Sequence, residues 1–166
     1  MADEKPVRAL VMDSSADTLD LLRQYLEFHG FAVETCNLGR LRREGIDVAD
    51  TVAHVHPDVV VFDIALPYDV NWEMCAALQQ DPRIDAPFVL TTTNRAAVER
   101  LTGARGVIEI LGKPYDLEHV AEAVRAAAAA RDSSPDGAPP RTNARRGIDR
   151  RDRDRRREER RKKSSS

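Results

Sequence analysis

The chain has 166 residues, of which 42% are hydrophobic, and its formal net charge at pH 7 is −2. This length and composition indicate one folded domain and an additional segment. The sequence has no run of 18 or more apolar residues, so we expect no membrane span. Residues 1–6 lack the apolar core of a secretory signal. Cys36 and Cys75 are too few for a disulfide framework. We therefore expect a cytoplasmic protein with both cysteines in its core.

The small net charge conceals two regions of opposite sign. Residues 1–131 carry thirteen basic and twenty-one acidic side chains (−8), whereas residues 132–166 carry thirteen basic and seven acidic ones (+6). Pro, Ser and Gly over residues 132–140 are typical of a linker, and Ile148 is the only large apolar side chain after it. We predict a folded domain over residues 1–131 and a disordered, Arg-rich linker and tail over residues 132–166.

Five short apolar segments alternate with five segments whose apolar residues recur at helical spacing. The predicted strands are residues 7–12, 31–36, 57–63, 87–93 and 107–111. The predicted helices are residues 15–28, 38–55, 72–80, 94–101 and 117–131. Ser15, Asn94 and Asp116 are suitable N-caps. His29-Gly30 ends the first helix, and Gly45 interrupts or delays the second.

Regular β-α alternation implies right-handed crossovers and a parallel sheet with helices on both faces. Five strands in about 125 residues fit a flavodoxin-like, doubly wound (βα)5 three-layer sandwich with strand order 2-1-3-4-5. The consecutive apolar residues 59–62 suit a strand that is buried on both faces. In this order the first and third strands are neighbours, so Asp13 and Asp63 should face each other at one edge of the sheet.

Four polar side chains are expected at that edge: Asp13, Asp63, Thr92 and Lys113. Two close carboxylates repel each other and favour a hard cation such as Mg²⁺. A carboxylate can also act as a nucleophile toward phosphorus. A transferred phosphoryl group is stabilised by a metal, an ammonium and a hydroxyl donor, and Lys113 and Thr92 would supply the last two.

The position of the hydroxyl is open to a shift of one residue. Thr91 or Thr93 could take the place of Thr92, although Pro87, five positions earlier, favours Thr92. Pro114 fixes the turn after Lys113 and is compatible with a cis peptide bond.

These motifs together resemble the receiver domain of two-component response regulators over roughly residues 7–130. The matching segments are Val11-Met12-Asp13, Val61-Phe62-Asp63 with Leu66-Pro67, Leu90-Thr91-Thr92, and Lys113-Pro114-Tyr115. The resemblance implies that Asp63 is the phosphoacceptor, that Thr92 is the switch hydroxyl and that Lys113 contacts the phosphoryl group. It also implies that Asp13, Asp63 and the backbone carbonyl of Ala65 hold Mg²⁺.

The resemblance further implies partners and a mode of action. The phosphoryl donor would be a sensor histidine kinase or a phosphotransfer protein. A downstream protein would contact the face formed by the fourth and fifth predicted helices and the fifth strand. The domain would then be a signalling module and not an enzyme.

Three positions depart from the family pattern. Ser14 stands where a second acid is usual, which should weaken Mg²⁺ binding. Asn71 replaces a glycine, and asparagine tolerates a positive φ better than most residues. Ile110 replaces the aromatic switch residue, so the usual rotation of an aromatic side chain cannot occur.

These departures keep other hypotheses open. The chain could be a degenerate receiver that acts as a phosphorylation-independent binding or scaffold module. Its basic tail could bind nucleic acid or an acidic protein, fold back on the acidic domain, or serve only for solubility. A phosphohydrolase with an Asp nucleophile is disfavoured, because such enzymes commonly have an acid two residues after the nucleophile and Ala65 is at that position. A dinucleotide site is disfavoured because no Gly-rich turn follows the first strand. The basic cluster of Arg40, Arg42 and Arg43 is predicted to be a solvated face.

Overall fold

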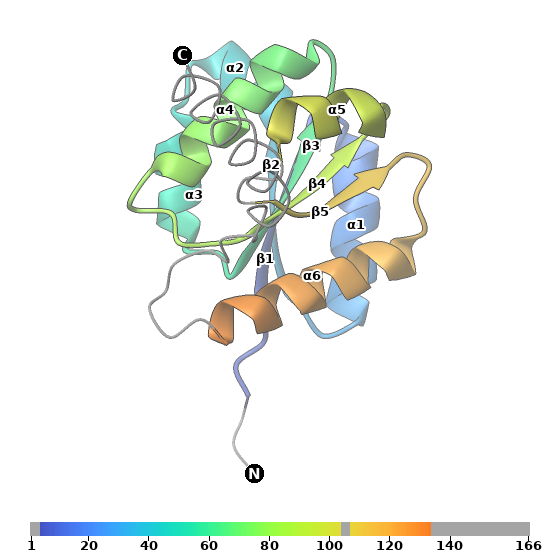
Figure 1. Ribbon diagram of the computed structural model, residues 1–166. Helices are drawn as coiled ribbons and strands as arrows, with labels where there is room; N and C mark the ends of the chain where they lie inside the picture. The colour runs from blue at the N-terminus through green and yellow to red at the C-terminus, as the bar shows by residue number, and fades with distance from the viewer. Residues whose placement is uncertain (1–3, 104–106, 134–166) are drawn as a thin grey trace, which may run out of the picture.

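The computed structural model describes residues 4–103 and 107–133, in which strands and helices alternate (Figure 1). The strands are β1 (Arg8–Asp13), β2 (Ala32–Asn37), β3 (Val59–Ile64), β4 (Phe88–Thr92) and β5 (Val107–Gly112). The helices are α1 (Ala16–Phe28), α2 (Leu38–Glu44), α3 (Val48–Val55), α4 (Tyr68–Gln80), α5 (Arg95–Thr102) and α6 (Leu117–Asp132). The predicted linker and tail lie almost wholly outside the described residues.

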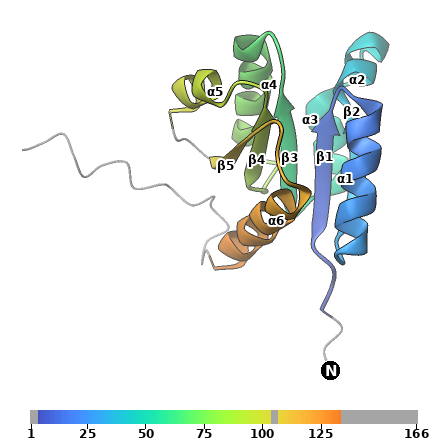
Figure 2. The ribbon, with the colours of Figure 1, turned by 90° about the vertical axis from the view of Figure 1, so that its right-hand side faces the viewer.

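The five strands form one parallel sheet in the order β2-β1-β3-β4-β5. Figure 2 shows the strands side by side in this order. The predicted doubly wound topology is therefore confirmed, and β1 and β3 are neighbours at the point where the chain reverses its direction of winding.

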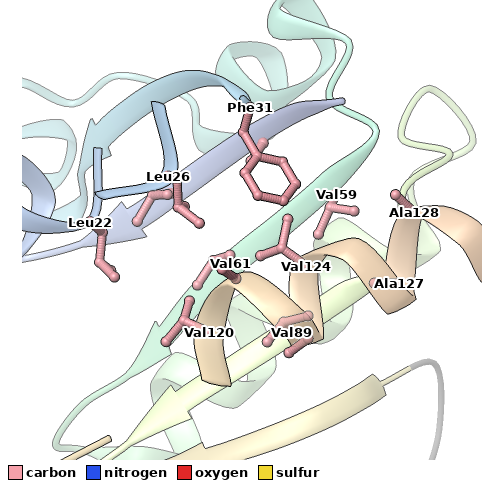
Figure 3. Close-up of a cluster of buried hydrophobic side chains, with 14 of the residues drawn as sticks. Leu22, Leu26, Phe31, Val59, Val61, Val89, Val120, Val124, Ala127 and Ala128 are labelled. Carbon is pink, nitrogen blue, oxygen red and sulfur yellow. The ribbon is translucent and has the colours of Figure 1, made fainter. Parts of the chain in front are cut away.

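One face of the sheet is covered by α1 and α6, which lie on the same side in Figure 1. The branched side chains of Val61 and Val89 point to this face and pack with Leu22 of α1 and Val124 of α6 (Figure 3). Val11 of β1 belongs to the same cluster. These side chains are almost completely buried, so this layer forms a continuous apolar core.

The other face is covered by α2, α3, α4 and α5. Alternate residues of the strands, among them Leu10, Phe62 and Leu90, point to this face and pack with Val52 of α3 and Cys75 of α4. Because neighbouring residues of a strand point to opposite faces, each central strand is apolar at consecutive positions, as its sequence predicted. Both cysteines are buried and unpaired, as expected.

Most of the predicted helix termini are confirmed. The side chains of Ser15, Asn94 and Asp116 accept hydrogen bonds from backbone N–H groups of the first turns of α1, α5 and α6. The predicted helix over residues 38–55 is two helices, because Gly45 adopts the left-handed conformation (φ 65°) that ends α2.

Helix α4 begins four residues earlier than predicted, at Tyr68 and not at Trp72. Pro67 occupies its N-cap position, and Pro suits the start of a helix because it lacks a backbone N–H. The sequence did not predict this first turn, because residues 68–71 show no apolar repeat at helical spacing. The peptide bonds that precede Pro67 and Pro114 are both cis.

The end of α6 is attached to the start of the sheet. Arg131 Nη1 lies 2.7 Å from Asp58 Oδ1, and the other oxygen of this carboxylate accepts a hydrogen bond from the backbone N–H of Arg8 at 2.8 Å. The C-terminus of α6 therefore lies at the amino ends of β1 and β3. Among the described residues, no helix is long and apolar enough to cross a membrane.

Candidate phosphoacceptor site

Two carboxylates and one ammonium meet at the carboxyl ends of the central strands. Lys113 Nζ lies 3.0 Å from Asp13 Oδ2 and 2.9 Å from Asp63 Oδ1. The aspartate side chains are 4% and 7% exposed, and the lysine side chain is 24% exposed. The sequence correctly predicted that these three residues, from β1, β3 and the turn after β5, come together.

The alternation of the strands explains this convergence. Val11 and Val61 point to the α1–α6 face of the sheet. Asp13 and Asp63 stand two residues after these valines in the same strands, so they are on the same face. Lys113 follows Leu111 of the same apolar cluster by two residues. The site therefore lies at the carboxyl ends of the strands, where the apolar core beneath α1 and α6 ends in polar side chains.

The site has perturbed acid–base properties. Burial raises the pKa of Asp63, and repulsion by Asp13 adds to the rise, whereas hydrogen bonds from Lys113 and Thr91 act against it without cancelling it. Burial acts to lower the pKa of Lys113, but its hydrogen bonds and attraction to Asp63 and Asp13 prevail and raise it. Lys113 therefore remains an ammonium at neutral pH and balances one of the two carboxylates.

The hydroxyl beside Asp63 belongs to Thr91. Thr91 Oγ1 donates to Asp63 Oδ1 at 2.9 Å, because the β3–β4 register places Thr91 opposite Asp63 on the same face of the sheet. Thr92, for which the sequence predicted this place, donates its hydroxyl to the backbone carbonyl of Ile64 at 2.9 Å, so its role as the switch hydroxyl stays a prediction. Thr92 Oγ1 also accepts a hydrogen bond from the backbone N–H of Asn94 at 3.2 Å.

The second carboxylate oxygen of Asp13 is bound by the N-cap residue of α1. Asp13 Oδ1 accepts a hydrogen bond from the backbone N–H of Ser15 at 2.8 Å. Ser14, which stands at the position of a second acid in the family pattern, is exposed at the mouth of the site. The described site thus contains two acids.

Asn71 has a different function from the one the sequence suggested. It is helical, so the positive φ considered for it does not occur; its side chain is buried and donates to the carbonyls of Ala65 at 2.8 Å and Pro67 at 3.1 Å. Arg42 donates in turn to Asn71 Oδ1. Arg42 is exposed, as predicted, but its guanidinium also contacts the buried side chain of Asn71.

Ile110 of β5 and Tyr115, which follows β5, pack on opposite faces of the sheet. Ile110 is partly buried against the core beneath α2–α5, whereas Tyr115 packs against the α1–α6 core. Burial raises the pKa of the Tyr115 phenol. A second aromatic residue, Tyr68 at the start of α4, hydrogen-bonds through its hydroxyl to Thr93 Oγ1 at 3.1 Å and connects this helix to the loop after β4.

The oxygen atoms at the site have the chemistry that a hard divalent cation prefers. Two carboxylates, Asp13 and Asp63, and one backbone carbonyl, Ala65, are available. The described residues contain no cluster of three or more His, Cys, Asp or Glu side chains that could hold a metal. The residues fit Mg²⁺ with two acidic ligands, which is a weaker set than three acids would provide.

A buried acid pair with a lysine, at the carboxyl edge of a five-stranded 2-1-3-4-5 sheet, defines a response-regulator receiver domain, and this chain contains one. The chain is 33% identical over 135 residues to response regulator MprA of Mycobacterium sp. strain KMS, covering 81% of this chain and 55% of that protein. It is also 33% identical over 122 residues to response regulator MprA of Mycolicibacterium vanbaalenii. The chain spans about half the length of these curated relatives.

Solved structures share the fold. The chemotaxis protein CheY4 of Vibrio cholerae superimposes with a TM-score of 0.62 at 20% identity, over 74% of this chain and 99% of that chain. A CheY-like receiver domain of Methanospirillum hungatei gives a TM-score of 0.62 at 20% identity, over 75% and 95% of the two chains. No family model matches the chain.

Proposed function

We propose that the domain is a phosphoacceptor in a two-component system, in which Asp63 receives a phosphoryl group from a sensor histidine kinase or a phosphotransfer protein. The observation that carries this proposal is the contact of one ammonium, Lys113, with both buried carboxylates. The domain acts as a signalling module in the cytoplasm. Its buried, unpaired cysteines agree with a reducing compartment.

In the proposed reaction a carboxylate oxygen of Asp63 attacks phosphorus. The bond from phosphorus to the donor's leaving atom breaks, and the product is an aspartyl phosphate. Lys113 stabilises the negative charge of the transferred oxygens, and Thr91 provides the nearest hydroxyl donor. Thr92 could reach the same oxygens only after its hydroxyl leaves the Ile64 carbonyl.

Mg²⁺ is the cofactor in this proposal. Asp13, Asp63 and the carbonyl of Ala65 would hold it, and it would neutralise charge on the phosphoryl oxygens. Because Ser14 replaces an acid, we expect a lower affinity for Mg²⁺ than three carboxylates would give. The downstream partner is proposed to contact the face formed by α5, β5 and α6, which corresponds to the last two predicted helices and the fifth strand.

Incubation with acetyl phosphate and Mg²⁺ tests the proposal. Intact mass spectrometry should show the gain of one phosphoryl group that hydroxylamine removes and that Asp63→Asn abolishes. The matched control is Asp69→Asn, because Asp69 is an exposed acid in the first turn of α4. No mass gain in the wild type would overturn the proposal and favour a phosphorylation-independent module.

A further inference from the structure

Helix α2 is connected to the loop that follows β3. The amide of Asn71 is 3% exposed, and its oxygen accepts a hydrogen bond from Arg42 in the last turn of α2. Its nitrogen donates to Ala65 at 2.8 Å. A continuous chain of hydrogen bonds therefore runs from α2 through Asn71 to a carbonyl two residues beyond Asp63.

The same helix is connected to the loop that follows β1. Asn37 is the N-cap of α2, and its Oδ1 accepts a hydrogen bond from the backbone N–H of Arg40 at 2.9 Å. Its Nδ2 donates to the carbonyl of Ser14 at 3.2 Å. A Cβ added at Gly39 would lie 3.3 Å from Asn37 Oδ1 and 3.9 Å from Ser14 Cβ, so the helix packs closely here.

Both connections act on backbone next to the acid pair. Ser14 directly follows Asp13, and Ala65 lies two residues after Asp63. Hydrogen bonds that orient the surroundings of metal ligands commonly change metal affinity by about tenfold or more. A satisfied buried amide also fixes one arrangement of the chain around it.

We propose that α2 is a brace that positions the loops after β1 and β3, with Asn37, Arg42 and Asn71 as its positioning residues. The side chain that holds the Ala65 carbonyl belongs to Asn71, which replaces a glycine of the family pattern. The consequence for Mg²⁺ rests on the proposed function, whereas the consequence for the order of the loops does not.

The first test measures Mg²⁺ affinity directly by titration, followed in backbone amide NMR spectra of the full chain. We expect Arg42→Ala and Asn71→Ala to weaken binding about tenfold, as the loss of orienting hydrogen bonds does elsewhere. Arg40→Ala is the matched control, because the Arg40 guanidinium is exposed and pairs with Glu44 on the same helix at 2.8 Å. Arg42→Lys should recover part of the affinity, since an ammonium can also donate to Asn71.

The second test needs no metal. Hydrogen exchange of the backbone amides of Ala65, Leu66 and Tyr68 should be faster in Arg42→Ala and Asn71→Ala than in the wild type and Arg40→Ala. Exchange in Asn37→Ala should be faster at residues 14 and 15. Wild-type exchange rates in Arg42→Ala, Asn71→Ala and Asn37→Ala would overturn the brace. If the wild type fails to bind Mg²⁺ or to gain a phosphoryl group, the proposed function fails, and the exchange experiment still decides the brace.

Discussion

At the scale of single residues, Lys113 is the group that makes the acid pair tolerable. Its ammonium lies within 3.0 Å of a carboxylate oxygen on either side, in a place where neither aspartate is well solvated. Buried charges of one sign are stable only when a counter-charge and hydrogen bonds compensate for lost hydration.

Replacing Lys113 by Met should therefore leave two repelling acids and raise the pKa of Asp63 further. We expect the free energy of unfolding near pH 8 to fall by about 3 kcal/mol, the lower end for a broken buried pair because the ammonium is partly exposed. The loss should be smaller near pH 5, measured by urea denaturation at about these two pH values. An equal loss at both would contradict the assignment.

The sign of this pH dependence follows from proton binding. The folded state holds Asp63 with a raised pKa, so between the ordinary value of 3.8 and the raised one it binds more protons than the unfolded chain. This carboxyl therefore makes stability fall as pH rises through that interval. The variant without Lys113 extends the interval upward.

The two neighbouring threonines should give opposite results. Thr91→Val removes a hydrogen bond that lowers the pKa of Asp63, so that pKa should rise in ¹³C NMR titrations of the side-chain carboxyls without Mg²⁺. Thr92→Val should leave it unchanged but cost about 1–3 kcal/mol of stability, because the buried Ile64 carbonyl loses its donor. A pKa shift in Thr92→Val alone would show that Thr92, and not Thr91, is the hydroxyl that acts on Asp63.

At the scale of elements, α1 illustrates how one helix divides into a structural and a solvent-facing side. Leu22 is 1% exposed and packs in the α1–α6 core, whereas Phe28, less than two turns later, is 86% exposed. Leu22→Ala should lower the free energy of unfolding by about 2–5 kcal/mol. Phe28→Ala should change it by less than about 0.5 kcal/mol. Thermal and urea unfolding of both variants would check this contrast, and equal losses would mean that Phe28 is covered in solution.

The elements also show what could be predicted from the sequence. Strand order followed from β-α alternation, and the meeting of Asp13, Asp63 and Lys113 followed from strand order. Thr91, which the sequence left open as an alternative to Thr92, lies on the face of Asp63, as strict alternation from Val61 and Val89 places it. The preference for Thr92 came from aligning on Pro87, which fixes a position along the strand and not the side of the sheet.

Asn71 and Arg42 could not have been found in this way. Their contact joins residues 29 positions apart, in α2 and α4, and depends on the angle between two helices that no periodicity specifies. The early start of α4 hid Asn71 in addition, because residues 68–71 carry no apolar repeat of helical spacing.

At the scale of the whole molecule, the two cores and the acid pair are all built from residues between Val7 and Ala128. A chain that ends at Ser133 should therefore keep the unfolding midpoint, the phosphoryl gain and the Mg²⁺ affinity of the full chain. Circular dichroism melting, mass spectrometry and NMR titration would show this. A lower midpoint in the shortened chain would mean that the domain extends beyond the predicted boundary.

The anchoring of Arg131 to Asp58 determines where the chain leaves this domain. Asp58 precedes β3 and Asp63 stands near its opposite end, five residues later, so the exit point and the acid pair are about 16 Å apart along the strand. Whatever is joined after residue 133 is thus tethered at the pole opposite to the chemistry. Within the described residues, a chemical change at Asp63 reaches that tether through the length of the sheet or along α6.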